Sequence, residues 1–479
     1  MNFAIIKSLL GTVLLFEGFF LLLPCIVSVC YGEAVGICYL VVAIMCILLG
    51  YALRSKKPIN KVFYAKEGFV TVALSWIILS IMGALPFVLS GEIKNFTDAL
   101  FETISGFTTT GASILADVEE ISKTGNFWRC ITHWIGGMGV LVFLLAIIPQ
   151  AGGHNFHLMR SESPGPSVGK LVPKVRYTAL ILYGIYLALT VLNIILLLVG
   201  KMPLYDALVT AFATAGTGGF GIYSDSIASF TSYQQWVITI FMLLFGINFN
   251  VYYLFLIKKP LQAFKLTEFR YYLGIFLVAA GLIFVNTLGR YELMADGIRH
   301  SAFQVASIMT TTGYATVDFN LWPDFSKFIL VILMFVGACA GSTGGGMKVS
   351  RFIIMGKTVR KEITHLLHPS LIKIIKLDGK SIEHDVIRSV NVYLITYLAI
   401  LFLSVLIVSL DNFGFTTNVT AVITTLNNVG PGLDMIGPTG NFAAFSSLSK
   451  YVLMFDMLAG RLELFPLLLI FVPRTWQKQ

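Results

Sequence analysis

Charged side chains are scarce in this sequence. Asp, Glu, Lys and Arg make up 12% of the 479 residues, whereas hydrophobic residues make up 56%. Soluble domains carry about 25% charged residues, so a water-soluble fold of this size could not cover its surface. The shortage of charge therefore excludes a soluble globular protein and indicates an integral membrane protein whose surface lies in lipid.

Catalytic and metal-binding motifs are also missing. The six cysteines are scattered without metal spacing and are expected to be small buried hydrophobic residues. GSTGGGMK (341–348) resembles a phosphate loop, but it lacks the GxxxxGK[ST] spacing and a preceding strand. His133 and Trp134 begin a predicted span near the outer interface, where packing is a better explanation for the histidine than metal binding. We predict no enzymatic site and no cofactor bound by this chain.

Long apolar runs are abundant, and each is long enough to form a helix across a hydrocarbon core of ~30 Å, which takes about 20 residues. We expect spans that begin near Phe3, Val35, Phe69, Arg129, Tyr177, Tyr233, Tyr271, Phe328, Val390 and Tyr451. The first run follows Lys7 like a signal peptide, but without a convincing cleavage site it is expected to be a retained helix. An even number of spans places both termini on one side of the membrane.

The distribution of charge indicates which side is cytoplasmic. The termini and the connections 54–67, 151–176, 258–270 and 348–388 hold 25 of the 34 Lys and Arg residues, so both termini are predicted to be cytoplasmic. The opposite face holds eight basic and fifteen acidic residues, which would concentrate cations there. Topology thus explains the net positive charge, and no nucleic-acid partner is expected.

A fourfold pattern occurs in the outer connections. Asp98, Asp206, His300 and Thr417 are each followed thirteen residues later by a glycine, within TTTGAS, GTGGFG, TTTGYA and NNVGPG. Each glycine follows about ten mildly apolar residues, which suffice for a half-helix but not for a span. The repeated unit is therefore span, half-helix, glycine turn and span, in four copies.

Four such loops can meet around one axis. Non-helical backbone at membrane depth is tolerated only where it lines water or is buried in protein, and its carbonyls can replace the hydration shell of an ion. Threonine adds hydroxyl oxygens without charge, and loops without carboxylates suit a monovalent cation better than Ca²⁺ or Mg²⁺. The C-termini of the half-helices also direct partial negative charge toward the ion. Ordinary outer turns are the alternative explanation for any single copy.

The predicted filter consists of three residues from each loop, and it is the only metal site expected. These residues are Thr109, Thr110, Gly111, Thr217, Gly218, Gly219, Thr311, Thr312, Gly313, Asn428, Val429 and Gly430. The four triplets differ, because the second is richer in glycine and the fourth has Asn and Val where others have Thr. We therefore expect broken fourfold symmetry and fewer strong ion sites than in a filter of identical loops.

A candidate gate follows the third loop. Five glycines occur in the ten residues from Gly337 to Gly346, and each disfavours a helix by about 1 kcal/mol relative to Ala. We predict a helix broken in the middle, with a mobile loop at Gly344, Gly345 and Gly346 that closes the inner pore. Close packing of helices by small residues is the alternative. Lys348 either projects toward the permeation path or marks the cytoplasmic boundary.

Arg461 lies within the last predicted span. A charge at that depth costs at least ~2.5 kcal/mol, so such residues usually face a cavity or a partner. One interpretation is a cation in the pore wall below the filter that acts as an electrostatic barrier. The alternative is an ion pair with Glu463 or Asp456.

These motifs resemble those of the Trk/Ktr/HKT superfamily of potassium transporters, and within it the TrkH/TrkG branch. The matching strings are SGFTTTGAS, ATAGTGGF, MTTTGYATVDFNLWP, TTLNNVGPGL, HWIGGMGV, GACAGSTGGGMKVSR and GRLELFP. The resemblance covers essentially the whole chain, including two extra N-terminal helices. It implies K⁺ uptake across the bacterial cytoplasmic membrane by a homodimer with one pore per subunit. It also implies a TrkA-like cytosolic ring, which binds nucleotide and gates the pore.

The division of the chain follows from the four copies of the repeated unit. We expect a two-helix N-terminal domain (1–67) and four pore repeats at 68–150, 151–258, 259–360 and 361–479. The second span of the third repeat is expected to be broken. The basic connection 348–388 is the preferred docking surface for the cytosolic regulator, and loop 151–176 is a second candidate. Ordinary positive-inside charge with lipid contact is the alternative for 348–388.

Overall fold

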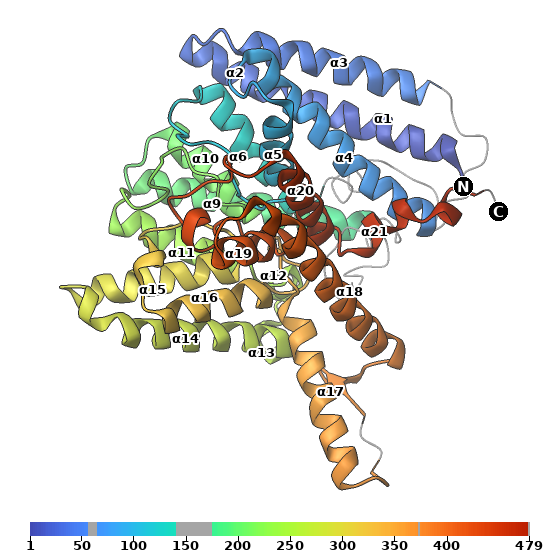
Figure 1. Cartoon of the computed structure of the whole chain (residues 1–479), viewed down its shortest axis with the longest axis vertical. Coiled ribbons are helices and arrows are strands. Elements are labelled where there is room, and N and C mark those ends of the chain that lie inside the picture. Colours follow the sequence, from blue (N-terminus) through green and yellow to red (C-terminus); the bar gives the residue numbers. More distant parts are fainter. Residues whose placement is uncertain (56–64, 140–174, 372–373, 478–479) are drawn as a thin grey trace.

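The computed structural model describes residues 1–55, 65–139, 175–371 and 374–477 (Figure 1). Nearly all regular structure in these ranges is α-helical. The described strands form one short antiparallel hairpin, β1 (Lys376–Leu377) with β2 (Lys380–Ser381). The expectation of a mostly helical protein is therefore confirmed.

Six helical segments in the described ranges are long and apolar enough to cross a membrane, as their runs of aliphatic residues predict. The first joins α1 (Phe3–Phe20) and α2 (Leu22–Tyr31), and the others are α3 (Gly36–Arg54), α4 (Ala65–Ser90), α9 (Val175–Val199), α14 (Thr267–Thr287) and α18 (His384–Val408). A seventh would join α11 (Ser232–Phe245) and α12 (Phe249–Leu256), which are bent by 89° at the break between them.

The remaining expected spans differ from continuous helices. The helix expected near Arg129 begins earlier, as α6 (Lys123–Gly137), and the chain beyond Gly139 lies outside the described residues. The helix expected near Phe328 is α16 (Asp324–Val336), which stops at Gly337 with a φ of 68°. The last is split into α20 (Ser447–Arg461) and α21 (Phe465–Leu468). The break at Gly337 was predicted from its glycines, whereas the split after Arg461 was not, because apolar residues continue beyond it.

Four shorter helices precede the four glycine turns. They are α5 (Phe96–Phe107), α10 (Leu204–Gly216), α15 (Met294–Met309) and α19 (Phe415–Leu426). Each has 12 to 16 residues and is too short to cross a bilayer. The α5 helix packs between α4 and α6, and α19 packs against α18 and α20. The short helices are thus held by longer neighbours, which position the turns that follow them.

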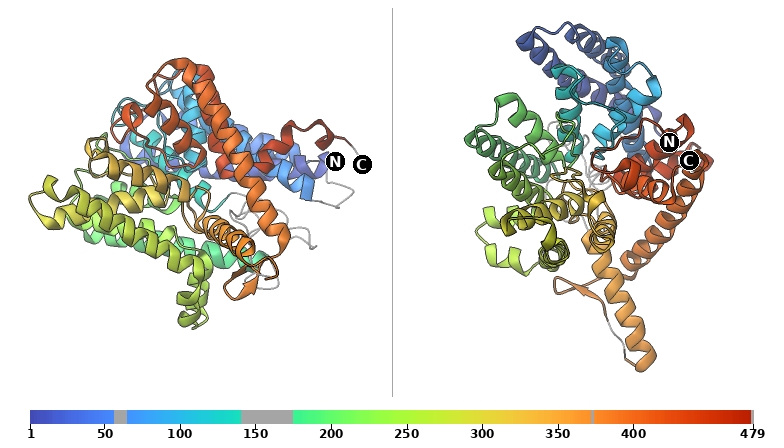
Figure 2. Two further views of the ribbon diagram at one scale, coloured as in Figure 1. Left: turned by 60° about the horizontal axis from the view of Figure 1, so that its bottom comes forward. Right: turned by 60° about the vertical axis from the view of Figure 1, so that its left-hand side comes forward.

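The two ends of the molecule have different shapes. Figures 1 and 2 show α1 to α3 along one edge, whereas α17 (Val349–Leu367) projects from the opposite end beside α18. The short helix α13 (Pro260–Lys265) follows α12.

The ring of Phe3 stacks on that of Trp476 at a centroid distance of 6.5 Å. The first helix and the C-terminal segment therefore lie side by side.

Candidate ion-binding site

The four glycine turns have the same backbone conformation. Each short helix ends in a Schellman motif, in which the last turn is closed by two backbone hydrogen bonds and the next residue is left-handed. The bond that spans five residues joins Thr110 N to Ser105 O (2.9 Å) in the first turn. Its equivalents are Gly218 to Ala213 (2.9 Å), Thr312 to Ser307 (2.8 Å) and Val429 to Thr424 (2.8 Å). The left-handed residues are Thr109, Thr217, Thr311 and Asn428, with φ of 56°, 54°, 58° and 55°.

The left-handed conformation at these positions is strained. Threonine is β-branched, and a positive φ is rare for such residues. It costs roughly 1–2 kcal/mol relative to the right-handed helix. The glycine two positions later also has positive φ in every turn, at 77°, 79°, 86° and 97°. Strain of this kind persists only where surrounding structure imposes it, and it is concentrated at functional sites.

The four turns close into a ring. A Cβ atom added to any of the four glycines would meet a carbonyl oxygen of the next turn. The pairs are Gly111 with Gly218, Gly219 with Thr312, Gly313 with Val429, and Gly430 with Thr110. The last pair returns to the first turn. Glycine is required because only a hydrogen atom fits against the neighbouring backbone.

The structure therefore brings all twelve predicted filter residues into one ring. Within the described part of the chain, no hydrogen bond uses any of their twelve backbone carbonyl oxygens as an acceptor. Buried carbonyls are nearly always paired. This concentration of unpaired oxygens is suited to binding a cation in place of water.

Most of the threonine hydroxyls are engaged elsewhere. Thr110 Oγ1 lies 2.8 Å from Thr108 Oγ1 and accepts a hydrogen bond from Asn428 Nδ2 at 3.0 Å. Thr312 Oγ1 forms the same contact with Thr310. Thr109 Oγ1, by contrast, has no partner among the described residues. The hydroxyls thus mainly bond within their own turns, with one contact between turns from Asn428 to Thr110, and backbone carbonyls are the more available oxygens.

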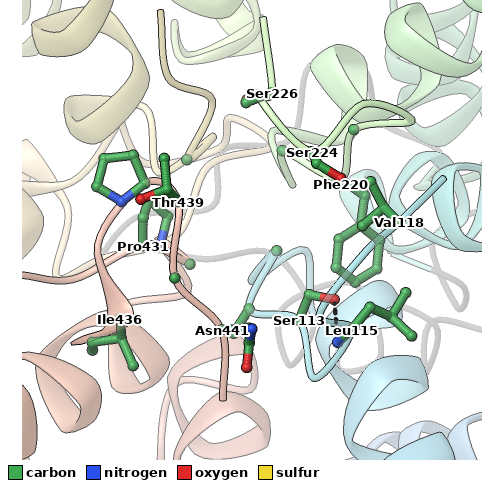
Figure 3. Close-up of a pocket in the computed structure, with 18 of the residues that line it drawn as sticks. Ser113, Leu115, Val118, Phe220, Ser224, Ser226, Pro431, Ile436, Thr439 and Asn441 are labelled. Carbon is green, nitrogen blue, oxygen red and sulfur yellow. Dashed lines mark hydrogen bonds between the residues drawn. The ribbon is translucent and has the colours of Figure 1, made fainter. Parts of the chain in front are cut away.

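The ring opens into a cavity of about 110 Å³ on one side. All four ring glycines line it, together with residues of the segments that follow the turns (Figure 3). Ser113, Phe220 and Pro431 lie around the opening in Figure 3. The lining of this cavity combines backbone and small polar groups with apolar side chains such as Phe220 and Pro431.

A buried ion pair behind the first turn was missed by our sequence reasoning. Glu102 of α5 and Arg129 of α6 approach to 2.8 Å, and their side chains are almost fully buried. Glu102 also accepts a hydrogen bond from Ile114 N at 3.0 Å, just beyond the turn. Arg129 Nη1 donates to Asn126 Oδ1 at 2.8 Å. An acid in the half-helix and a base in the following span were the available signal, since ionisable residues at membrane depth usually pair.

We expect loss of either partner to be strongly destabilising. Arg129→Met should lower the free energy of unfolding by ~3–5 kcal/mol, because the Glu102 carboxylate would be left buried and unpaired. Thermal unfolding in detergent would measure this change. The double variant Glu102→Gln/Arg129→Met should recover part of the loss. Arg299→Ala breaks the more exposed pair with Asp296 and should cost less than ~1 kcal/mol. Equal effects of Arg129→Met and Arg299→Ala would contradict a structural role of the buried pair.

His133 corrects one expectation from the sequence. It was expected near the outer interface at the start of a span, but it lies in the C-terminal part of α6 and is fully buried. Its Nδ1 lies 2.8 Å from Gly106 O, and its Nε2 accepts a hydrogen bond from Phe220 N at 3.2 Å. The first turns of α6 are polar, so the apolar run placed the start of this helix too late in the sequence. His133 thus joins the first half-helix to the second turn.

The same histidine explains why the second turn is rich in glycine. A Cβ atom at Gly216 would clash with the His133 backbone, and one at Gly218 with its ring. The second turn nevertheless has the same left-handed residue and ring glycine as the others. Its different sequence therefore reflects a bulky neighbour and not a different backbone.

The candidate gate residues lie against this ring. Gly337 to Lys348, here called the intramembrane loop, connects α16 to α17 without helix. Gly345 N donates to Thr311 Oγ1 at 2.6 Å, and Gly346 N donates to Asn427 O at 2.9 Å. Gly344 packs against Thr310. The predicted break in the helix is present, and the loop is hydrogen-bonded to the third and fourth turns.

Two cations hold carbonyls of the intramembrane loop. Lys348 is buried, and its ammonium donates to the carbonyls of Gly344 and Gly345. Arg461 donates to Thr343 O at 2.9 Å and, across the site, to Gly137 O of α6 at 2.8 Å. The acids considered as its ion-pair partners have other contacts, since Glu463 pairs with Arg351 and Asp456 accepts from Ser404.

Apolar helices around a ring of carbonyls that have no donor in the described ranges define the class, which is that of multi-pass membrane proteins that transport ions. A family model described as TrkH, cation transport protein, matches residues 39–294 and 290–478. The chain belongs to the TrkH family, whose members are transporters and not enzymes.

Individual relatives match over the full length of the chain. The Trk system potassium uptake protein TrkH of Salmonella typhimurium is 34% identical, with both chains covered completely. TrkG of Escherichia coli is 31% identical over 95% of this chain and 94% of its own. The crystal structure of the potassium transporter TrkH from Vibrio parahaemolyticus is similar with a TM-score of 0.89 and 30% identity, and both chains are covered completely.

Proposed function

We propose that this protein takes up K⁺ across the bacterial cytoplasmic membrane through a channel-like pore whose filter is the ring of four turns. The observation that carries the proposal is a closed ring with twelve carbonyl oxygens that accept no hydrogen bond from the described residues. Carbonyls of this kind replace the hydration shell of a monovalent cation. The names of the relatives, which are potassium uptake proteins, favour K⁺ as the substrate.

The proposed architecture comprises the two-helix domain and four pore repeats of the sequence analysis, around one pore per subunit of a homodimer. The four identical Schellman motifs support a fourfold repeated unit. The adjacency of Phe3 and Trp476 supports termini on one side, and the positive-inside rule makes that side cytoplasmic.

The intramembrane loop is the proposed gate. It lies against the ring, and Lys348 and Arg461 place two positive charges next to the loop carbonyls. Cations beside the pore would oppose the passage of K⁺ until the loop moves.

The regulator is proposed to be a TrkA-like cytosolic ring that binds nucleotide. Its preferred docking surface is α17 with the β1–β2 hairpin, within 348–388, because α17 projects from the body and is basic. The other candidate, loop 151–176, lies almost entirely outside the described residues.

Ion flux tests the proposed function. Purified protein in liposomes should pass K⁺ and Rb⁺ down a gradient faster than Na⁺, and flux should rise when the cytosolic partner is added. A fluorescent indicator of internal K⁺, with protein-free liposomes as the control, would measure it. Absence of flux in the presence of the partner would overturn the proposal.

A further inference from the structure

The intramembrane loop is fastened to the bend between α11 and α12. Cys339 N donates to Gly246 O at 3.0 Å, and Phe249 N donates to Gly341 O at 3.0 Å. The 89° bend frees backbone groups that a continuous helix would use internally. The loop is thus held from behind as well as against the ring.

One buried carboxylate contacts both this loop and the helix that follows it. Glu268 is the second residue of α14, and only 8% of its surface is exposed. Its Oε1 accepts hydrogen bonds from Ala340 N at 2.7 Å and from Ser350 N at 3.2 Å. Ala340 lies early in the loop, and Ser350 lies in the first turn of α17. A single oxygen therefore joins the beginning of the loop to the helix that leaves it.

The chemistry of this contact favours a carboxylate. Negative charge is stabilised at a helix N-terminus, where backbone N–H groups have no partner within the helix. Hydrogen bonds to an ionised acceptor are roughly twice as strong as those between neutral groups. At Ser350, Glu268 provides negative charge at the N-terminus of α17 and a carboxylate oxygen that accepts the backbone N–H. It also satisfies a loop N–H that has no helical partner.

We propose that Glu268 is a positioning residue that holds the intramembrane loop in its closed position. We call its two hydrogen bonds from Ala340 and Ser350 the Glu268 clasp. The inference rests on the proposed gating role of that loop. Because α17 continues outward from Ser350 and projects from the molecule, a partner that displaces α17 would pull Ser350 from Glu268. Release of this contact would free the beginning of the loop, at Ala340, at the same time. Glu268 thus links displacement of α17 to movement of the loop.

Cys339 provides a test that does not depend on ion flux. Its side chain is fully buried within the loop, next to Ala340. In full-length protein that retains Cys339 but has the other five cysteines replaced by Ser or Ala, Glu268→Ala should raise the rate of modification by N-ethylmaleimide about tenfold or more. Partner-free K⁺ flux should rise with it.

Two further variants at this position make the test specific. Glu268→Gln retains an acceptor oxygen of the same reach and should react much more slowly than Glu268→Ala. Glu268→Asp withdraws the acceptor by one methylene, so its rate of Cys339 modification should be intermediate. It replaces Glu268→Ala in the test if the alanine variant does not fold. The control is Glu292→Ala, which changes an exposed acid before α15, away from α17 and the intramembrane loop, and should leave the rate unchanged.

The outcomes separate this inference from the proposed function. Unchanged reactivity of Cys339 in both Glu268→Ala and Glu268→Asp would overturn the clasp. Equal reactivity of Glu268→Gln and Glu268→Ala would also overturn it, because the acceptor would then be irrelevant. Faster modification without ion flux in any variant would support the clasp and count against the channel.

Discussion

Replacing Gly111 by alanine is expected to reduce K⁺ flux by about tenfold or more, since overpacking of a closely packed site costs ~1–3 kcal/mol. The added methyl group would overlap the carbonyl oxygen of Gly218 in the adjacent turn. Relief of this clash requires the second turn to move, and with it a carbonyl of the ring. Flux of K⁺, Rb⁺ and Na⁺ into liposomes would measure the effect.

Gly91→Ala is the matched control for this prediction. Gly91 has a φ of 78°, close to the 77° of Gly111, but no atom lies within 4 Å of the position of an added Cβ. It therefore shares the backbone strain without the clash, and its flux should remain near that of the unmodified protein.

Gly313→Ser, which would meet Val429 O, should alter K⁺/Na⁺ discrimination. Unchanged flux and discrimination in both ring variants would remove these glycines from the filter.

Loss of Arg461 is expected to have the opposite effect on flux. Arg461→Ala removes hydrogen bonds that tie Thr343 of the intramembrane loop to Gly137 of α6. Bonds from a charged donor contribute ~1.5–3 kcal/mol each. The closed arrangement should therefore be weakened, and partner-free K⁺ flux should rise by about tenfold or more. The same liposome assay without the cytosolic partner would detect it.

A control with another arginine shows whether the effect is local. Arg299→Ala removes an arginine from α15 that pairs with Asp296 near the surface, and it should leave partner-free flux unchanged. Arg461→Lys keeps the charge but cannot span both carbonyls, so its flux should lie between those of the unmodified protein and Arg461→Ala. Equal flux in the unmodified protein and Arg461→Ala would assign Arg461 to packing alone.

The ring residues could be predicted from the sequence because their signal is local. The thirteen-residue spacing to each glycine reflects a short helix closed by a Schellman motif, which needs neighbours only five residues away. The break at Gly337 was predictable for the same reason, since glycine disfavours a helix wherever it occurs. Continuous spans were predicted less well: α20 ends at Arg461, although apolar residues continue beyond it.

Contacts between distant segments could not be predicted in this way. Nothing near Gly216 or Gly218 in the sequence indicates that His133 occupies the space beside them. Glu102 was identifiable as a charge at membrane depth, but its partner could not be read from the chain. The hydroxyls of the threonines were expected to offer oxygens to the ion, whereas most of them bond within the protein.

The sequence by itself determined the membrane class, the positive-inside pattern and the four glycine turns, because hydropathy, charge and turn chemistry are properties of short segments. Only the tertiary structure decided that the four turns close into one ring and that Arg461 and Glu268 hold the intramembrane loop. Those contacts join residues up to several hundred positions apart, and no local pattern encodes such a distance. The physical reason is that the ring is formed by tertiary packing, in which four strained turns lie so close together that only glycine fits between them.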